Sequence, residues 1–159
     1  MTPTEHSNRP ERPNASGTIA ENRRARFDYE ITQTYEAGIE LHGYEVKGAK
    51  AGAMQVAGTH VLIRGGEAWL VNAHIPAFQP KNTPVDYEDD RARRLLLSRA
   101  ELIELSDILK SKSAHVIPLR AYLKRGLIKI ELGIGRSRKK SDKREVLKKR
   151  SHLREMRER

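Results

Sequence analysis

Alternating apolar and polar residues predict a β-strand near the start of the folded part of the chain. Phe27, Tyr29 and Ile31 are spaced two residues apart, and Tyr35 follows after one break in the alternation. This period is typical of a half-buried strand.

Two hairpins are predicted further along the chain. Apolar runs within residues 60–75 flank Gly65-Gly66, a dipeptide that suits a tight turn. A second pair of apolar runs, residues 115–123 and 127–134, flanks Lys124-Arg125-Gly126. Each pair predicts two antiparallel strands joined by a short turn.

Helical signals are fewer. Ser98 and Glu101 form a capping box, and the apolar positions that follow predict a helix to about Lys110. A short helix is predicted within residues 41–52, with Gly48 or Gly52 at its end. Residues 76–90 contain three prolines and predict a long surface loop.

These elements predict a mainly β fold with a few helices. Five or six short strands joined by hairpins, with no β–α–β alternation, favour a small antiparallel sheet or barrel, and closure would remove exposed edges. We assign residues 21–135 to this single domain.

Charge separates the C-terminal segment from the rest of the chain. Residues 136–159 hold twelve Lys/Arg and four Asp/Glu, so they carry +8 of the total net charge of +10. Such a segment suits a polyanion, with an acidic protein as the less common alternative. Its apolar stripe, Val146, Leu153 and Met156, is too narrow to fold alone, and we predict a disordered tail that folds on binding.

Residues 1–20 have zero net charge, three prolines and no apolar stretch, and we interpret them as a disordered leader rather than a secretory signal. No apolar run reaches the roughly 18 residues of a membrane span. The chain has no cysteine. We expect a cytoplasmic protein with no membrane contact.

Catalysis is poorly supported. The six histidines lack a metal-binding spacing, and His60 and His74, which flank the first hairpin, are interpreted as polar strand-end residues. The acidic stretch of residues 86–90 lies beside Arg91, Arg93 and Arg94 and predicts a solvated, salt-bridged loop. We predict no enzyme, no catalytic residue, no metal and no cofactor.

RNA binding is better supported. Arginines cluster at residues 23–26, at residues 91–94 and in the C-terminal segment. Together they supply phosphate contacts around a β-scaffold that offers Tyr or His for stacking.

Five segments, in this order, resemble the SsrA-binding proteins, the partners of transfer-messenger RNA in ribosome rescue. They are NRRARFDYEI (22–31), YEAGIELHGYEVKGAKAG (35–52), HVLIRGGEAWLVNAHI (60–75), RARRLLLSRAEL (91–102) and SDKRE (141–145). The resemblance implies a closed antiparallel β-barrel of the oligonucleotide-binding type with about three helices.

The resemblance also implies a surface for the tRNA-like domain of transfer-messenger RNA. Its positions are Asn22, Arg23, Arg24, Arg26, Glu36 and Leu96. A carboxylate such as Glu36 repels phosphate, but it accepts hydrogen bonds from base amino groups or 2′-hydroxyls. Two alternatives remain open, a structural ion pair at Glu36 and a core position for Leu96.

For the tail, the resemblance implies entry into the decoding centre of the small ribosomal subunit and a helix in the empty messenger channel. The implied residues are Arg136, Arg138, Lys139, Lys140, Asp142, Lys143 and Arg144. Ser141 stands where relatives carry a ring, and a serine has no ring to stack on a ribosomal base. Ser137 stands where relatives carry a glycine.

The hypothesis is a monomeric, non-enzymatic adaptor that delivers transfer-messenger RNA to stalled ribosomes for trans-translation. The alternatives are a ribosomal or ribosome-assembly protein, and an RNA-processing enzyme. The RNA that co-purifies with the chain would separate the three.

Overall fold

A computed structural model describes residues 17–158, except for the side chains of residues 140, 142 and 158. Its strands are β1 (Thr18–Glu21), β2 (Tyr29–Ile39), β3 (His60–Arg64), β4 (Glu67–Val71), β5 (Arg93–Leu96), β6 (His115–Lys124) and β7 (Leu127–Ser137). Its helices are α1 (Ala25–Asp28), α2 (Gly43–Lys50), α3 (Arg99–Lys110) and α4 (Lys140–Glu158), with a 3₁₀ turn at Pro80–Asn82.

The strands form one antiparallel sheet in the order β1-β6-β7-β2-β5-β4-β3. Between residues 17 and 158, no hydrogen-bonded ladder joins the end strands β1 and β3. The mainly β, antiparallel prediction is therefore confirmed, whereas closure of the barrel by hydrogen bonds is not.

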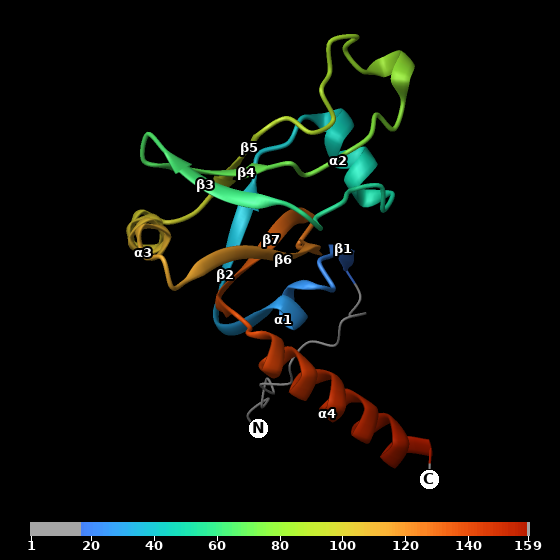
Figure 1. Cartoon of the computed structure of the whole chain (residues 1–159). Helices are drawn as coiled ribbons and strands as arrows, with labels where there is room; N and C mark the ends of the chain where they lie inside the picture. Colours follow the sequence, from blue (N-terminus) through green and yellow to red (C-terminus); the bar gives the residue numbers. More distant parts are fainter. Residues whose placement is uncertain (1–16, 159) are drawn as a thin grey trace, which may run out of the picture.

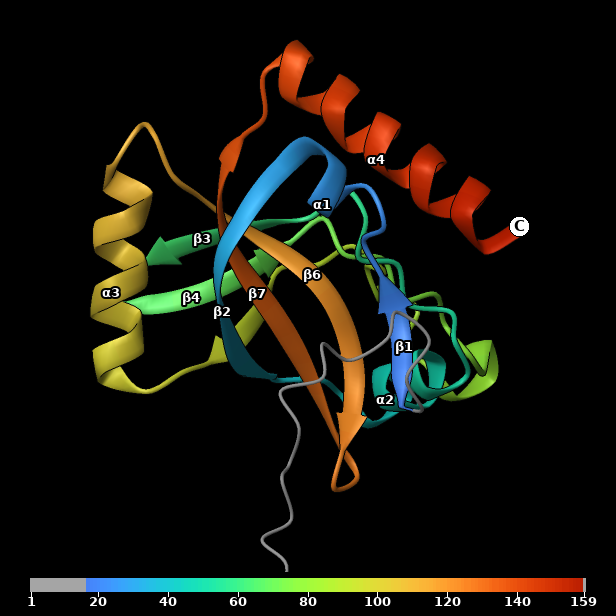
Figure 2. The same ribbon diagram turned by 90° about the horizontal axis from the view of Figure 1, so that it is seen from below.

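Strand β2 links the two halves of the sheet. Most of its length pairs with β7, and its last two residues, Gly38 and Ile39, pair with β5. The ladder shifts register between Ile31 and Gln33, which explains the break in the alternation. In Figure 2, β2 curves alongside β7, whereas β3 and β4, which belong to the other half of the sheet, run across the direction of β2.

The core lies on the inner side of this curved sheet. Side chains of β2, β4, β6 and β7 fill it, and Leu105 of α3 is fully buried against them. In Figure 1, α3 and α2 lie near opposite ends of the β3–β4 hairpin, and α4 extends away from the body beside α1. Of the residues described, no helix is both long and apolar enough to cross a membrane.

Most predicted elements are confirmed. Both hairpins form, and the capping box of α3 joins the Ser98 side chain to the Glu101 backbone N–H at 3.2 Å.

Three elements differ from the prediction. The first strand was predicted to begin too early, because residues 25–28 form the turn of α1. Strand β1 begins inside the predicted leader (1–20) and ends one residue beyond it, and residues 1–16 of that leader fall outside the described part. Strand β5 was not predicted, because three consecutive leucines (95–97) show no alternation.

The arginines at residues 91–94 have partners other than those that the sequence predicted. The ion pairs of Arg91 and Arg93 are made with Glu45 of α2, whose side chain is fully buried. Toward the acidic loop, Arg93 donates to the Asp89 carbonyl oxygen at 2.8 Å and to the Tyr87 hydroxyl at 3.1 Å. Arg93 is also fully buried and donates to the Ala73 carbonyl oxygen at 2.6 Å. Since a buried guanidinium cannot reach a phosphate, Arg93 is not part of an RNA-binding surface.

The C-terminal segment also differs from the prediction of a disordered tail. Strand β7 continues to Ser137, two residues past the predicted end of the domain, and Lys140–Glu158 forms helix α4. The segment contains no proline or glycine after Gly135, so nothing in its sequence interrupts a helix once its first turn is held.

Candidate nucleic-acid interface

One solvent-facing side of the sheet gathers several of the predicted RNA-binding residues. Tyr122 of β6 lies opposite Lys129 of β7, Lys129 lies opposite Gly38 of β2, and Gly38 lies opposite Leu96 of β5. Directly opposed residues share a face of a sheet. We call this the outer face and define it by Arg26, Glu36, Leu96, Arg120, Tyr122, Lys124, Lys129 and Glu131.

Glu36 lies near the centre of the outer face and is already hydrogen-bonded. The Tyr122 hydroxyl donates to Glu36 Oε2, and Lys124 Nζ lies 3.1 Å from the same oxygen. The hydrogen bond from Tyr122, with that from Lys124, holds the pKa of Glu36 below its ordinary value although partial burial opposes the shift. Glu36 is therefore an ionised carboxylate that accepts hydrogen bonds from two neighbouring side chains.

A second group of charges lies next to Glu36. Glu131 is the cross-strand neighbour of Glu36 on β7, and Arg120 Nε donates to Glu131 Oε2 at 2.8 Å. Arg26 of α1 reaches the other carboxylate oxygen at 3.6 Å and remains largely exposed. The outer face thus runs without interruption from α1 to the β6–β7 turn.

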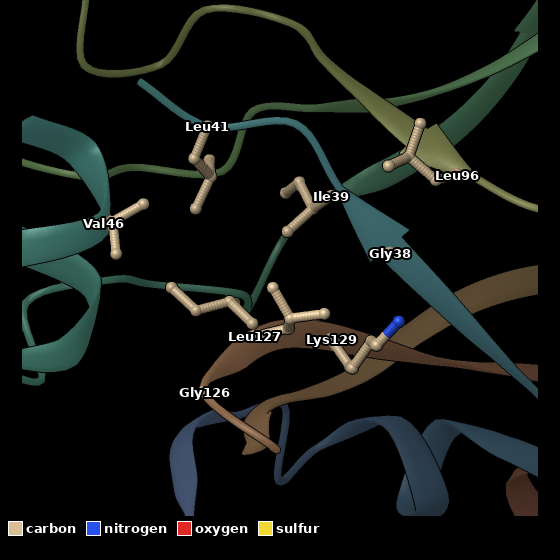
Figure 3. Close-up of a pocket in the computed structure, with 9 residues that line it drawn as sticks. Gly38, Ile39, Leu41, Val46, Leu96, Gly126, Leu127 and Lys129 are labelled. Carbon is tan, nitrogen blue, oxygen red and sulfur yellow. The ribbon is translucent and has the colours of Figure 1, made fainter. Parts of the chain in front are cut away.

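Leu96 lies on the surface and not in the core. Its side chain is 46% exposed, whereas its neighbour Leu95 is 2% exposed. Figure 3 shows Leu96 at one end of a pocket and Val46 of α2 at the other, with Leu127 and Lys129 along one side. This largely apolar pocket continues the outer face toward α2.

The remaining predicted positions lie elsewhere. Asn22 and Arg24 line a separate pocket between α1, the segment before β3 and the start of β6. The Asn22 amide donates to the Pro118 carbonyl oxygen at 3.1 Å, so its described contact holds β1 and α1 against β6. Arg23 is exposed. The predicted set therefore occupies two surfaces, with Arg26, Glu36 and Leu96 together on the outer face.

The tail motif begins against α1. The Arg138 backbone N–H donates to the Asp28 carbonyl oxygen at 2.8 Å, and Lys143 Nζ lies 3.2 Å from Asp28 Oδ1. Arg136 pairs with Glu30 in the β2–β7 ladder. Arg144 and Ser141 are exposed on α4, and Lys139, which precedes the helix, is also exposed. The side chains of Lys140 and Asp142 lie outside the described part.

Sequence reasoning missed the contribution of the β6–β7 hairpin to the outer face. Arg120, Tyr122 and Lys124 alternate with apolar residues, and this spacing was the available signal. By itself this spacing indicates only a strand. Which other strand these side chains meet depends on the pairing of β6 with β7 and of β7 with β2. Among residues 17–158, no group of three or more His, Cys, Asp or Glu could hold a metal ion.

Comparisons with known proteins agree on one family. Residues 19–159 match the protein family described as SmpB protein. The SsrA-binding protein of Nostoc punctiforme is 45% identical over 138 residues, which cover 87% of this chain and 89% of that protein. The SsrA-binding protein of Chromohalobacter salexigens is 42% identical over 140 residues, covering 88% and 89%.

A solved structure adds the same likeness in three dimensions. A chain from "tmRNA-SmpB: a journey to the center of the bacterial ribosome" is 38% identical, with a TM-score of 0.62. The match covers 80% of this chain and 92% of that one. On the family match over nearly the whole described sequence, the chain belongs to the SmpB family of SsrA-binding proteins.

Proposed function

We propose that this chain is an RNA-binding adaptor that binds transfer-messenger RNA and delivers it to stalled bacterial ribosomes in trans-translation. The observation that carries the proposal is the likeness, in sequence and in fold, to a chain of the tmRNA-SmpB ribosome structure. The SsrA-binding relatives name the same RNA partner. An adaptor of this kind works on the ribosome and therefore in the cytoplasm.

In this proposal the sheet binds the tRNA-like domain. The outer face supplies Arg26, Glu36 and Leu96, while Asn22, Arg23 and Arg24 act beside it. The curved sheet serves as a scaffold of the oligonucleotide-binding type, in which side chains on a β-surface meet bases and phosphates. The role is binding and not catalysis, and we expect the chain to act as a monomer.

In the same proposal α4 and the residues before it serve the ribosome. The positive charges of residues 136–159 suit ribosomal RNA, and a long exposed helix such as α4, which carries most of them, fits an empty messenger channel. Arg136, Arg138, Lys139, Lys140, Asp142, Lys143 and Arg144 are the proposed tail positions at the decoding centre.

The test is to identify the RNA that binds the purified chain. We expect tight binding to the tRNA-like domain of transfer-messenger RNA, and weaker binding to an elongator tRNA of similar length at the same salt concentration. A chain that instead co-purifies with bulk ribosomal RNA and does not distinguish the two ligands would be a ribosomal or assembly protein. Cleaved RNA in the same assay would indicate an enzyme.

A further inference from the structure

The carboxylate of Glu36 has little capacity left for an RNA ligand. One carboxylate offers about four acceptor sites. The Tyr122 hydroxyl and Lys124 Nζ make three hydrogen bonds to it, with Lys124 at 3.1 Å from Oε2 and 3.3 Å from Oε1. A base amino group would have to compete with both neighbours for the same two oxygens.

Tyr122 is held from two sides. Glu36 accepts its hydroxyl hydrogen, and the guanidinium carbon of Arg120 lies 4.3 Å from the centre of its ring. Arg120 is fixed in turn by Glu131 at 2.8 Å. Burial, and then the Glu36 carboxylate, raise the pKa of Tyr122, so its hydroxyl stays protonated and continues to donate. The result is an aromatic ring held in one orientation on the solvent-facing side of the sheet.

Lys124 supplies a cation at the edge of this ring. It is the last residue of β6, and its side chain is 53% exposed although it pairs with Glu36. Lys129 lies directly across the strand pair from Tyr122 and also lowers the pKa of Glu36 by its charge. A ring beside two lysines is the combination that RNA-binding β-surfaces use for one nucleotide, with a base on the ring and its phosphate on the cation.

We propose that Tyr122 and Lys124 contact a nucleotide of the bound RNA, and that Glu36 is a positioning residue that acts through them. The inference deepens the proposed function and rests on it. Glu36 fixes the direction of the Tyr122 ring and prevents the Lys124 side chain from sampling other rotamers. This positioning role explains why a carboxylate lies on a surface that binds a polyanion.

A double-mutant cycle tests the inference. Binding to the tRNA-like RNA is measured for the wild type, Glu36→Gln, the pair Tyr122→Phe with Lys124→Met, and the triple variant. We expect Glu36→Gln to weaken binding about 5–30-fold in the wild-type background, the range of one or two lost hydrogen bonds. In the Tyr122→Phe, Lys124→Met background it should change binding less than about twofold, because no partner remains for Glu36 to position.

Equal losses in the two backgrounds, or no loss from Glu36→Gln in the wild type, would overturn the inference. The first result would indicate a direct contact between Glu36 and the RNA. Lys124→Met alone should flatten the slope of log K against log salt by about 0.7–0.9, as expected for one phosphate contact. An unchanged slope would exclude Lys124 from the interface.

Asp89→Asn is the matched control. Asp89 lies in the loop before β5, outside the strands, and its half-exposed carboxylate pairs with His74 Nδ1 at 3.6 Å. We expect unchanged RNA binding, and circular dichroism verifies that every variant is folded. If the wild type itself does not bind the tRNA-like RNA, the proposed function fails. If the wild type binds and the losses add, only the positioning role fails.

Discussion

Glu45 is a fully buried carboxylate between two guanidinium groups. Burial alone would raise the pKa of Glu45, but hydrogen bonds from Arg91, the His42 backbone N–H and Arg93 outweigh burial and lower this pKa to about 2. The Tyr87 hydroxyl joins the cluster and donates to the Ile75 carbonyl oxygen at 2.6 Å. The cluster therefore ties α2 to the loop before β5.

This cluster predicts a loss of stability in acid. In the unfolded chain the pKa of Glu45 is near 4.5, and in the folded chain it is about 2. Its contribution to stability is therefore present above pH 4.5 and is lost as the pH falls toward 2. We expect Glu45→Gln to cost about 3–5 kcal/mol at pH 7, because it leaves the buried guanidinium group of Arg93 and the partly exposed one of Arg91 without a counter-charge.

Urea unfolding of the wild type and Glu45→Gln at pH 7, 4 and 3 measures this effect. The difference in free energy of unfolding between the two proteins should shrink as the pH falls. Glu67→Gln, which alters an exposed ion pair, should stay close to the wild type at all three values. A constant difference between wild type and Glu45→Gln would show that charge does not explain the role of Glu45.

Strand β7 depends on two glycines within its length. Gly133 and Gly135 are both buried inside β7. A Cβ on Gly135 would lie 2.7 Å from the Glu30 carbonyl oxygen, and one on Gly133 would lie 2.9 Å from Leu119 Cδ1. The absence of side chains lets β2 approach β7 closely, and this pairing places Glu36 beside Glu131.

Gly135→Ala should destabilise the protein by about 1–3 kcal/mol, the usual cost of overpacking. The clash involves backbone, which cannot move aside as a flexible side chain does. Gly43→Ala is the control, because a Cβ on Gly43 would meet nothing within 4 Å. Thermal unfolding compares the two. A Gly135→Ala protein as stable as Gly43→Ala would contradict the close approach of β2 and β7.

The molecule as a whole consists of a sheet domain and a helix that leaves it beside α1. Few described contacts hold α4 to the body, among them the Lys143–Asp28 ion pair and the proximity of Lys143 Nζ to the Phe27 ring, at 5.7 Å. Leu147, Leu153 and Met156 of α4 are exposed. The helix is thus attached at its start and is available for a partner along most of its length.

Removing everything after Ser137 should leave a folded body. Exposed ion pairs contribute about 0–1 kcal/mol each, so the free energy of unfolding should change little. Affinity for the tRNA-like RNA should fall modestly through lost nonspecific charge, whereas peptide tagging on stalled ribosomes should be almost abolished. The assay is a reconstituted rescue reaction with alanylated transfer-messenger RNA, measured beside direct RNA binding.

Replacing Asp142-Lys143-Arg144 by alanines should reproduce much of the tagging defect, while Ser141→His should be tolerated or beneficial. Normal tagging by the truncated protein would indicate that the tail serves only as an electrostatic anchor. Loss of RNA binding together with tagging would contradict the division into a binding body and a ribosome-facing tail.

The order of elements along the chain was largely determined by local sequence. Alternation, turn residues and a capping box act over a few residues, so both hairpins and α3 could be predicted from them. The basic tail and the family motifs likewise stand in the sequence itself. The same motifs mark Glu36 and Leu96 as candidate binding residues without any knowledge of their spatial neighbours.

The partners of these residues were decided by tertiary structure, because they come from distant parts of the chain. Glu45 meets Arg93 across 48 positions, and Glu36 meets Tyr122 across 86. No local pattern carries such pairings, which follow from strand order and register. Because of these pairings, Arg93 is a buried structural residue and not the surface cation that its sequence predicts. The same pairings place Tyr122 and Lys124 beside the carboxylate of Glu36.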